Sequence, residues 1–176
     1  MADPKLYHVL FVCTGNLVRS VMGEAILKMF LRKNDIQNIH VSSAGTWAVD
    51  GEMAPINTLV ACDEHYVDVR KHLSTRVTEE LFSKSDLILV MEKSHKQKIV
   101  NNMPQIHRKV FMLKSFQSDE PEADVQDPMG RDLDYFRHAF EEIEFEVKRI
   151  FPYLVKVANE ATGTLPFQSS MNLEPL

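Results

Sequence analysis

Residues 6–20 of this chain read LYHVLFVCTGNLVRS, and this stretch decides the fold. The segment from Leu6 to Cys13 is almost wholly apolar and rich in β-forming residues, which is typical of a buried strand. A short polar loop follows as far as Ser20. Apolar residues then recur at helical spacing, at Met22, Ala25, Ile26, Met29 and Phe30. The stretch therefore predicts a strand, a loop and a helix in direct succession.

The same alternation continues along the rest of the chain. Further strands are predicted at 39–43, 86–91 and 109–113, and further helices at 55–64, after Thr78, at 93–100 and at 133–154, the last kinked or ended near Pro152. This order indicates an α/β fold: a single domain with a four-stranded parallel sheet and helices on both faces, as in Rossmann-like proteins. We place the domain at residues 1–158 and predict a mobile C-terminal tail at 159–176.

The composition fits one globular domain. The chain has 176 residues, of which 44% are hydrophobic and 26% charged, so it can build one sizeable core. Its net charge of -5 disfavours a general nucleic-acid-binding protein, which would carry a basic excess. The sequence has 2 cysteines, too few for a disulfide framework, and no apolar stretch long enough to span a membrane. We therefore expect a cytoplasmic protein that binds no nucleic acid.

The loop between Cys13 and Ser20 has the residues of an oxyanion site. In a parallel α/β sheet, ligands bind at the carboxyl ends of strands, where a helix N-terminus offers N–H groups to an anion. The same positive potential favours a reactive Cys13 thiolate, and the planar Arg19 guanidinium can hold phosphate oxygens. Gly15 permits close approach and unusual dihedrals, Asn16 tolerates the left-handed region, and Ser20 could contact the thiolate and cap the helix. The alternative is an inert buried cysteine followed by a capping turn.

Together these residues resemble the low-molecular-weight protein tyrosine phosphatases, whose loop reads roughly C-x-G-N-x-C-R-S-P. The resemblance covers residues 6–155 in the family's order. It includes VSSAGT at 41–46, DLILVME at 86–92 and the pair Asp127–Pro128 before the last helix. The resemblance implies the family's fold, cysteine-based hydrolysis of phosphotyrosine, and no metal or cofactor. The sequence has no clustered Cys/His metal motif.

The resemblance also implies roles for individual residues. Cys13 would attack phosphorus to form a phosphocysteine, Arg19 would clamp the phosphate, and Asp127 would act as general acid and then as general base. From the residues alone, Asp127 is one acid in a solvated loop, and Asp-Pro is common in turns. The implied substrate-binding residues are Thr14, Gly15, Asn16, Leu17, Val18, Ser20 and Trp47, and the implied supporting residues are Ser43, His72 and Pro128. Trp47 would stack on an aryl ring, and its alternative is partial burial in the core.

Three positions near the loop depart from the family pattern. Val18 replaces a second loop cysteine, which removes the partner of a protective disulfide with Cys13. Val21 replaces the usual proline and Gly23 a common alanine, and both changes are expected to loosen the first helical turn. Weaker activity is one expected consequence.

Leu17 favours an aromatic substrate. The arginine-phosphate branch of the family carries threonine there, and a bulky apolar side chain disfavours a guanidinium group. We therefore expect a phosphotyrosine-containing protein, or a small aryl phosphate, as the substrate. Two alternatives stay open: a pseudophosphatase that binds phosphoproteins without hydrolysis and, less favoured, an arsenate reductase, which needs further cysteines for its disulfide relay.

Overall fold

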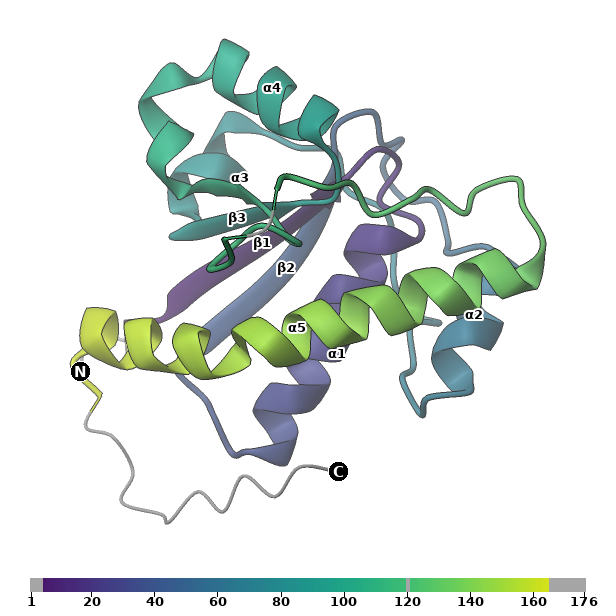
Figure 1. Cartoon of the computed structure of the whole chain (residues 1–176), viewed down its shortest axis with the longest axis horizontal. Coiled ribbons are helices and arrows are strands. Elements are labelled where there is room, and N and C mark those ends of the chain that lie inside the picture. The colour runs from purple at the N-terminus through teal and green to yellow at the C-terminus, as the bar shows by residue number, and fades with distance from the viewer. Residues whose placement is uncertain (1–4, 120, 165–176) are drawn as a thin grey trace.

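Strands alternate with helices throughout the structure, a computed structural model that describes residues 5–119 and 121–164 (Figure 1). The elements are β1 (Tyr7–Cys13), α1 (Arg19–Lys33), β2 (Ile39–Gly45), α2 (Ile56–Asp63), α3 (Glu79–Lys84), β3 (Leu87–Val90), α4 (Lys93–Asn102), the 3₁₀ helix η1 (Pro104–Lys109), β4 (Val110–Met112) and α5 (Leu133–Thr162). The strands form a 4-stranded sheet in the order β2-β1-β3-β4, and all neighbours are parallel. The predicted fold class is confirmed.

Helices cover both faces of this sheet. Successive side chains of a strand point to opposite faces, so Val9 and Phe11 of β1 join one core cluster while Leu10 and Val12 join the other. The larger cluster lies under α1, α2 and α5, and the smaller one lies under α3 and α4 (Figure 1). Burial on both faces explains why β1 and β3 read as continuous apolar runs.

The long C-terminal helix differs from the prediction at its end. α5 continues past Pro152 and past the expected domain boundary at 158, as far as Thr162. Its last turn is fastened to the sheet because Asn38 Nδ2 donates to Asn159 Oδ1 at 2.9 Å and to Thr162 Oγ1 at 3.0 Å. The first residues of the predicted tail therefore belong to the domain, whereas 165–176 lie outside the described residues. Within the described ranges, no helix is long and apolar enough to cross a membrane.

Two helices begin at the end of the sheet where the strands have their carboxyl ends. Cys13, the last residue of β1, pairs in register with Gly45 of β2, and Val12 pairs with Val90 of β3. α1 begins after the loop that leaves β1, and α4 begins shortly after β3. Residues that leave both strands are therefore brought together at this end of the sheet, which is where α/β proteins bind ligands.

Candidate active site

Asn16 lies fully buried at the centre of the phosphate loop, which we define as residues 13–20. Its φ of 54° lies in the left-handed region, which asparagine tolerates. Its Nδ2 donates to Ser43 Oγ at 2.8 Å and to Ser20 Oγ at 2.9 Å, and its Oδ1 accepts from Thr75 N at 2.8 Å. His72 Nε2 lies 2.8 Å from the Asn16 carbonyl oxygen. We call these five residues the Asn16 network, and it fixes the backbone of the loop.

The sulfur of Cys13 is buried inside this loop. The Asn16 backbone N–H donates to Cys13 Sγ at 3.3 Å, and Ser20 Oγ lies 3.0 Å from the same sulfur. Because Ser20 Oγ already accepts a hydrogen bond from Asn16, its own O–H is free to donate to the sulfur. Two donors therefore converge on Cys13 Sγ, and such donors stabilise negative charge on it.

The helix cap predicted at Ser20 is wrong. α1 begins at Arg19, and its N-cap residue is Val18, whose side chain makes no capping hydrogen bond. Ser20 is thus already inside the first turn of the helix, with its hydroxyl turned towards Cys13. The physical reason is that this hydroxyl is used within the loop, so it is not available to the helix backbone.

The unusual dihedrals expected at Gly15 are not found, and the loop makes its closest glycine contact with the rest of the protein at Gly45. The φ of Gly15 lies outside the left-handed region, and a Cβ added there would meet only its neighbour Leu17, at 3.8 Å. A Cβ at Gly45 would lie 2.5 Å from the Thr14 carbonyl oxygen and 2.8 Å from the Asn16 nitrogen. Glycine at the end of β2 therefore lets the phosphate loop lie directly against the strand.

Gly23 lies at a tight contact between α1 and β1. A Cβ added there would lie 2.6 Å from Cδ1 of Phe11, whose ring is fully buried in β1. Alanine would therefore clash with β1, and glycine lets α1 approach the sheet. Val21, in the first turn of α1, is also buried in the core.

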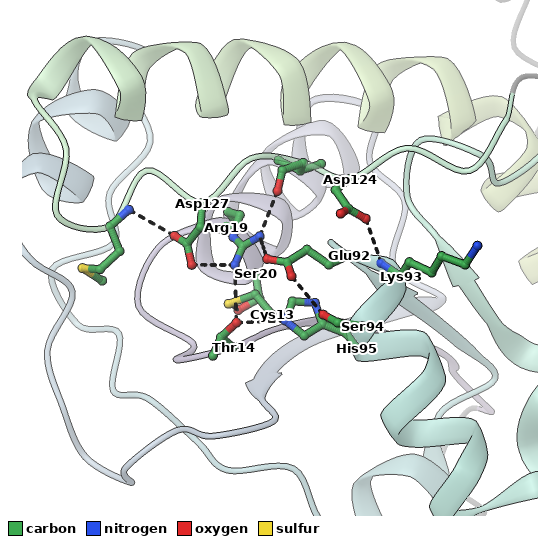
Figure 2. A network of polar contacts seen from close by, with 12 residues as sticks. Cys13, Thr14, Arg19, Ser20, Glu92, Lys93, Ser94, His95, Asp124 and Asp127 are labelled. Atoms are coloured by element: carbon green, nitrogen blue, oxygen red, sulfur yellow. Dashed lines mark hydrogen bonds and ion pairs between the residues drawn. The ribbon is translucent and has the colours of Figure 1, made fainter.

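Arg19 is almost completely buried, with 1% of its surface exposed, and its guanidinium lies among acceptors (Figure 2). Nη1 pairs with the Glu92 carboxylate and donates to the Val125 carbonyl oxygen at 2.8 Å. Nη2 pairs with Asp127 Oδ2 at 2.6 Å and lies 3.5 Å from Thr14 Oγ1. We call Arg19, Glu92, Val125 and Asp127 the Arg19 network. Burial opposes ionisation of Glu92, but the hydrogen bond and charge of Arg19 outweigh it and lower the Glu92 pKa.

The loop that carries Asp127 is fastened to the end of β3. The Val125 nitrogen donates to the Met91 carbonyl oxygen at 2.8 Å, and the Lys93 nitrogen donates to Asp124 Oδ1 at 2.8 Å. The Asp127 side chain is 41% exposed, while the following Pro128 is buried. Asp127 thus reaches Arg19 from one side and solvent from the other, which suits a group that must exchange protons.

The other side chains expected to bind substrate show mixed exposure. Val18 is buried, and Leu17 is partly buried with its carbonyl oxygen 3.2 Å from Thr58 Oγ1 of α2. Trp47 is 66% exposed, so the alternative of core burial is wrong for it. Its backbone N–H donates to the Thr14 carbonyl oxygen at 2.9 Å, and Lys98 Nζ lies 3.6 Å from its ring centroid. Trp47 therefore stands beside the phosphate loop with much of its surface free.

Sequence reasoning missed three side chains of the site. Glu92 was part of a quoted motif, and its place directly after a buried strand could have marked it. Glu24 Oε2 accepts from Ser43 Oγ at 2.5 Å, and His95 Nε2 lies 2.9 Å from Thr14 Oγ1. No local pattern marks Glu24 or His95, because both reach the site only through packing.

The second cysteine, Cys62, has no contact with this network among the hydrogen bonds of the described residues. It is fully buried in α2, and burial raises the pKa of its thiol to about 12. In the described ranges, no three His, Cys, Asp or Glu side chains lie close enough together to hold a metal ion.

A model of the family described as low molecular weight phosphotyrosine protein phosphatase matches residues 8–161. The chain belongs to this family. A protein-arginine-phosphatase of Bacillus subtilis is 34% identical over 148 residues, covering 84% of this chain and 97% of its own. A probable low molecular weight protein-tyrosine-phosphatase, EpsP of Ralstonia nicotianae, is 33% identical over 136 residues, covering 77% of this chain and 88% of its own.

Solved structures of the low molecular weight phosphatase family share the fold described above. The YwlE arginine phosphatase from Geobacillus stearothermophilus superposes with a TM-score of 0.79 at 31% identity, covering 88% of this chain and 96% of its own. The tyrosine phosphatase Wzb from Escherichia coli K30, in complex with sulphate, gives a TM-score of 0.75 at 26% identity over 85% of this chain and 99% of its own. The family therefore includes relatives named for two kinds of phosphorylated residue.

Proposed function

We propose that this phosphatase hydrolyses phosphotyrosine through a phosphocysteine intermediate, with Cys13 as nucleophile, Arg19 as phosphate clamp and Asp127 as general acid and base. One observation carries the proposal. The buried Cys13 sulfur accepts a backbone N–H in a loop that also supplies Arg19, and Arg19 contacts Asp127 directly. Nucleophile, clamp and proton donor are thus within one cluster of contacts (Figure 2).

In the first step, the Cys13 thiolate attacks phosphorus and the bond from phosphorus to the tyrosine oxygen breaks. Protonated Asp127 gives its proton to that oxygen, so tyrosine leaves as a neutral phenol. Arg19 exchanges its contact with Asp127 for the phosphoryl oxygens, which frees Asp127 to act on the leaving group. The backbone N–H groups of the loop stabilise the same oxygens.

In the second step, the Asp127 carboxylate takes a proton from water and the water oxygen attacks phosphorus. The bond between phosphorus and sulfur breaks, inorganic phosphate leaves, and Cys13 returns as a thiolate. The Ser20 hydroxyl, 3.0 Å from the sulfur, supports this leaving group in the second step as it supports the nucleophile in the first. Asp127 ends the cycle protonated, as it began.

Leu17 and Trp47 support an aryl substrate over a guanidinium. Both are large apolar side chains, Leu17 in the loop and Trp47 beside it, and Trp47 keeps 66% of its surface exposed. A second candidate is phosphoarginine, favoured by the 34% identity with the Bacillus subtilis protein-arginine-phosphatase. Two peptides that differ only in carrying phosphotyrosine or phosphoarginine separate these candidates by their kcat/KM values, and we expect phosphotyrosine to be preferred.

The decisive experiment is hydrolysis of p-nitrophenyl phosphate near pH 6 by the wild type, Cys13→Ser and Cys62→Ala. We expect turnover by the wild type and by Cys62→Ala, whose cysteine lies outside the site, and none by Cys13→Ser. A folded wild type without turnover that still binds phosphopeptides would instead support the pseudophosphatase. Thiol-dependent reduction of arsenate without phosphate release would support the arsenate reductase.

We further propose that the enzyme acts on phosphotyrosine-containing proteins in the cytoplasm and that the described domain suffices for catalysis. Both cysteines are free thiols, and the chemistry above needs a reduced Cys13. The net charge of -5 does not favour nucleic acid as a partner. A variant that ends at Thr164 should retain the kcat/KM of the full chain, and a large loss would assign a function to residues 165–176.

A further inference from the structure

Thr14 and His95 form a hydrogen-bonded pair that the steps above do not use. His95 lies in the first turn of α4 and Thr14 directly follows Cys13, and the two meet beside Arg19 (Figure 2). His95 Nε2 lies 2.9 Å from Thr14 Oγ1, and Arg19 Nη2 lies 3.5 Å from the same oxygen. The contacts thus run from His95 through Thr14 and Arg19 to Asp127.

The surroundings of His95 decide which ring nitrogen carries the proton. The residue is buried, and Nδ1 is a buried side-chain atom with no hydrogen-bond partner in the described part of the chain. A buried N–H without an acceptor is rarer and costlier than an unused acceptor, so the proton belongs on Nε2. Burial also lowers the pKa of His95, although Glu92 opposes this, and a lowered pKa favours the neutral ring. His95 Nε2–H therefore donates to Thr14.

The Thr14 hydroxyl can then make one further hydrogen bond, as a donor. A hydroxyl oxygen accepts two hydrogen bonds and donates one. His95 Nε2 and Arg19 Nη2 both donate to Thr14 Oγ1, so its acceptor sites are filled. Its proton has no acceptor among the hydrogen bonds of the described residues, and the hydroxyl lies beside the guanidinium nitrogen that also contacts Asp127.

We propose that the Thr14 hydroxyl donates a hydrogen bond to the phosphoryl group and that His95 is the positioning residue that aims it. This proposal rests on the proposed phosphatase function and adds a donor to it. The donor sits on the side of the loop where Arg19 meets Asp127, so it faces the oxygens next to the bond that breaks. Its effect should be stronger on the transition state, where charge on those oxygens redistributes, than on substrate binding.

Two matched pairs of variants test the proposal with p-nitrophenyl phosphate. Thr14→Val keeps the shape but removes the hydroxyl, and Thr14→Ser keeps the hydroxyl. His95→Leu removes the donor, and His95→Gln places an amide N–H near the position of Nε2. We expect Thr14→Val and His95→Leu each to lower kcat about tenfold with little change in KM, the size of one charge-assisted hydrogen bond. Thr14→Ser and His95→Gln should each recover most of that loss.

The double variant Thr14→Val/His95→Leu should be no slower than either single variant, because both remove the same donor. His107→Leu, an exposed histidine of η1, serves as the control for removing an imidazole. Additive losses would overturn the pairing, and wild-type kcat in a folded Thr14→Val would overturn the donor. Absence of turnover in the wild type would instead contradict the proposed function.

A measurement without turnover tests the same assignment. In ¹⁵N-labelled protein, NMR shifts distinguish an imidazole protonated on Nε2 from one protonated on Nδ1. We expect His95 to be neutral with the proton on Nε2 at pH 6, both in the wild type and in inactive Cys13→Ser. A proton on Nδ1 alone would make Thr14 the donor to His95 and would overturn the proposal even if the variants failed to fold.

Discussion

The two networks around the phosphate loop differ in the kind of contact that builds them. The Asn16 network is centred on an amide, and every hydrogen-bonding atom of the Asn16 side chain has a partner from the protein itself. The Arg19 network joins a buried cation to two partly exposed carboxylates. A phosphate dianion can replace Asp127 as the partner of Arg19. It cannot compete in the same way for the Asn16 side chain, whose donors and acceptor already have partners within the protein. In the mechanism that we propose, the Asn16 side of the site is therefore permanent, and the Arg19 side is exchanged in each catalytic cycle.

Removing the permanent side should have the largest effect. Asn16→Ala deletes the side-chain hydrogen bonds to Ser20, Ser43 and Thr75. The backbone N–H groups of the loop are then no longer held in the orientation that binds phosphate. We expect kcat on p-nitrophenyl phosphate to fall roughly 10²- to 10³-fold, as when an oxyanion donor is lost. Asn101→Ala, at an exposed position of α4, is the control. A loss below tenfold in a folded variant would mean that the loop keeps its shape without Asn16.

Removing Asp127, the proposed proton donor on the exchangeable side, should have an effect that depends on the leaving group. Asp127→Asn cannot protonate a poor leaving group, so kcat/KM for phenyl phosphate should fall about 10²-fold. The good leaving group of p-nitrophenyl phosphate needs less protonation, so its kcat/KM should fall less. Asp132→Asn, whose side chain makes no capping contact with α5, is the control. Equal losses for both substrates would argue against Asp127 as the acid.

Neutralising the carboxylate that stays with Arg19 should have a smaller effect. Glu92→Gln keeps a hydrogen-bond acceptor but removes the charge, and we expect a loss in kcat of about tenfold. The pKa of Glu92 is lower in the folded protein than its ordinary value of 4.5. The ion pair therefore adds stability above about pH 4.5, and this stability is lost as pH falls. Urea unfolding at pH 4 and pH 7 should show a smaller pH dependence in Glu92→Gln than in the wild type.

A change at the contact between α1 and β1, away from the polar groups of the site, should affect stability more than kcat. Gly23→Ala forces a methyl group to within 2.6 Å of the buried Phe11 ring if nothing moves. We expect a destabilisation of about 1 to 3 kcal/mol, typical of overpacking, with kcat of the folded fraction within about twofold of wild type. Chemical denaturation measures the first quantity and initial rates the second. Increased stability would show that α1 can move away from β1 at no cost.

The two thiols should differ in reactivity because their surroundings differ. Burial raises the pKa of Cys62 to about 12, whereas donors converge on Cys13. Iodoacetate at pH 7 should therefore modify Cys13 and leave Cys62 intact, as peptide mass mapping would show. Alkylation of Cys62 at a comparable rate would mean that α2 opens readily.

The strand, loop and helix at residues 6–33 could be predicted because their pattern is local. An apolar β-rich run, a polar loop with Gly15 and Asn16, and helical spacing afterwards are all legible in adjacent residues. The roles of Glu24, His95 and Gly45 could not be predicted in this way. They depend on which segments meet across the sheet: Thr14 and His95, for example, are separated by 81 positions. The predicted helix cap at Ser20 was wrong because the Ser20 hydroxyl contacts Cys13 instead of the helix backbone.

The fastening of α5 to Asn38 has a practical consequence. Asn38 directly precedes β2, whereas the other end of that strand, Gly45, touches the phosphate loop. Seven residues of extended strand separate these points, about 20 Å. A fluorophore, affinity handle or surface linker attached after Thr164 would therefore sit at the opposite end of the sheet from Cys13. Immobilised through this point, the enzyme would present its open site to the solution, which suits a sensor for phosphorylated peptides.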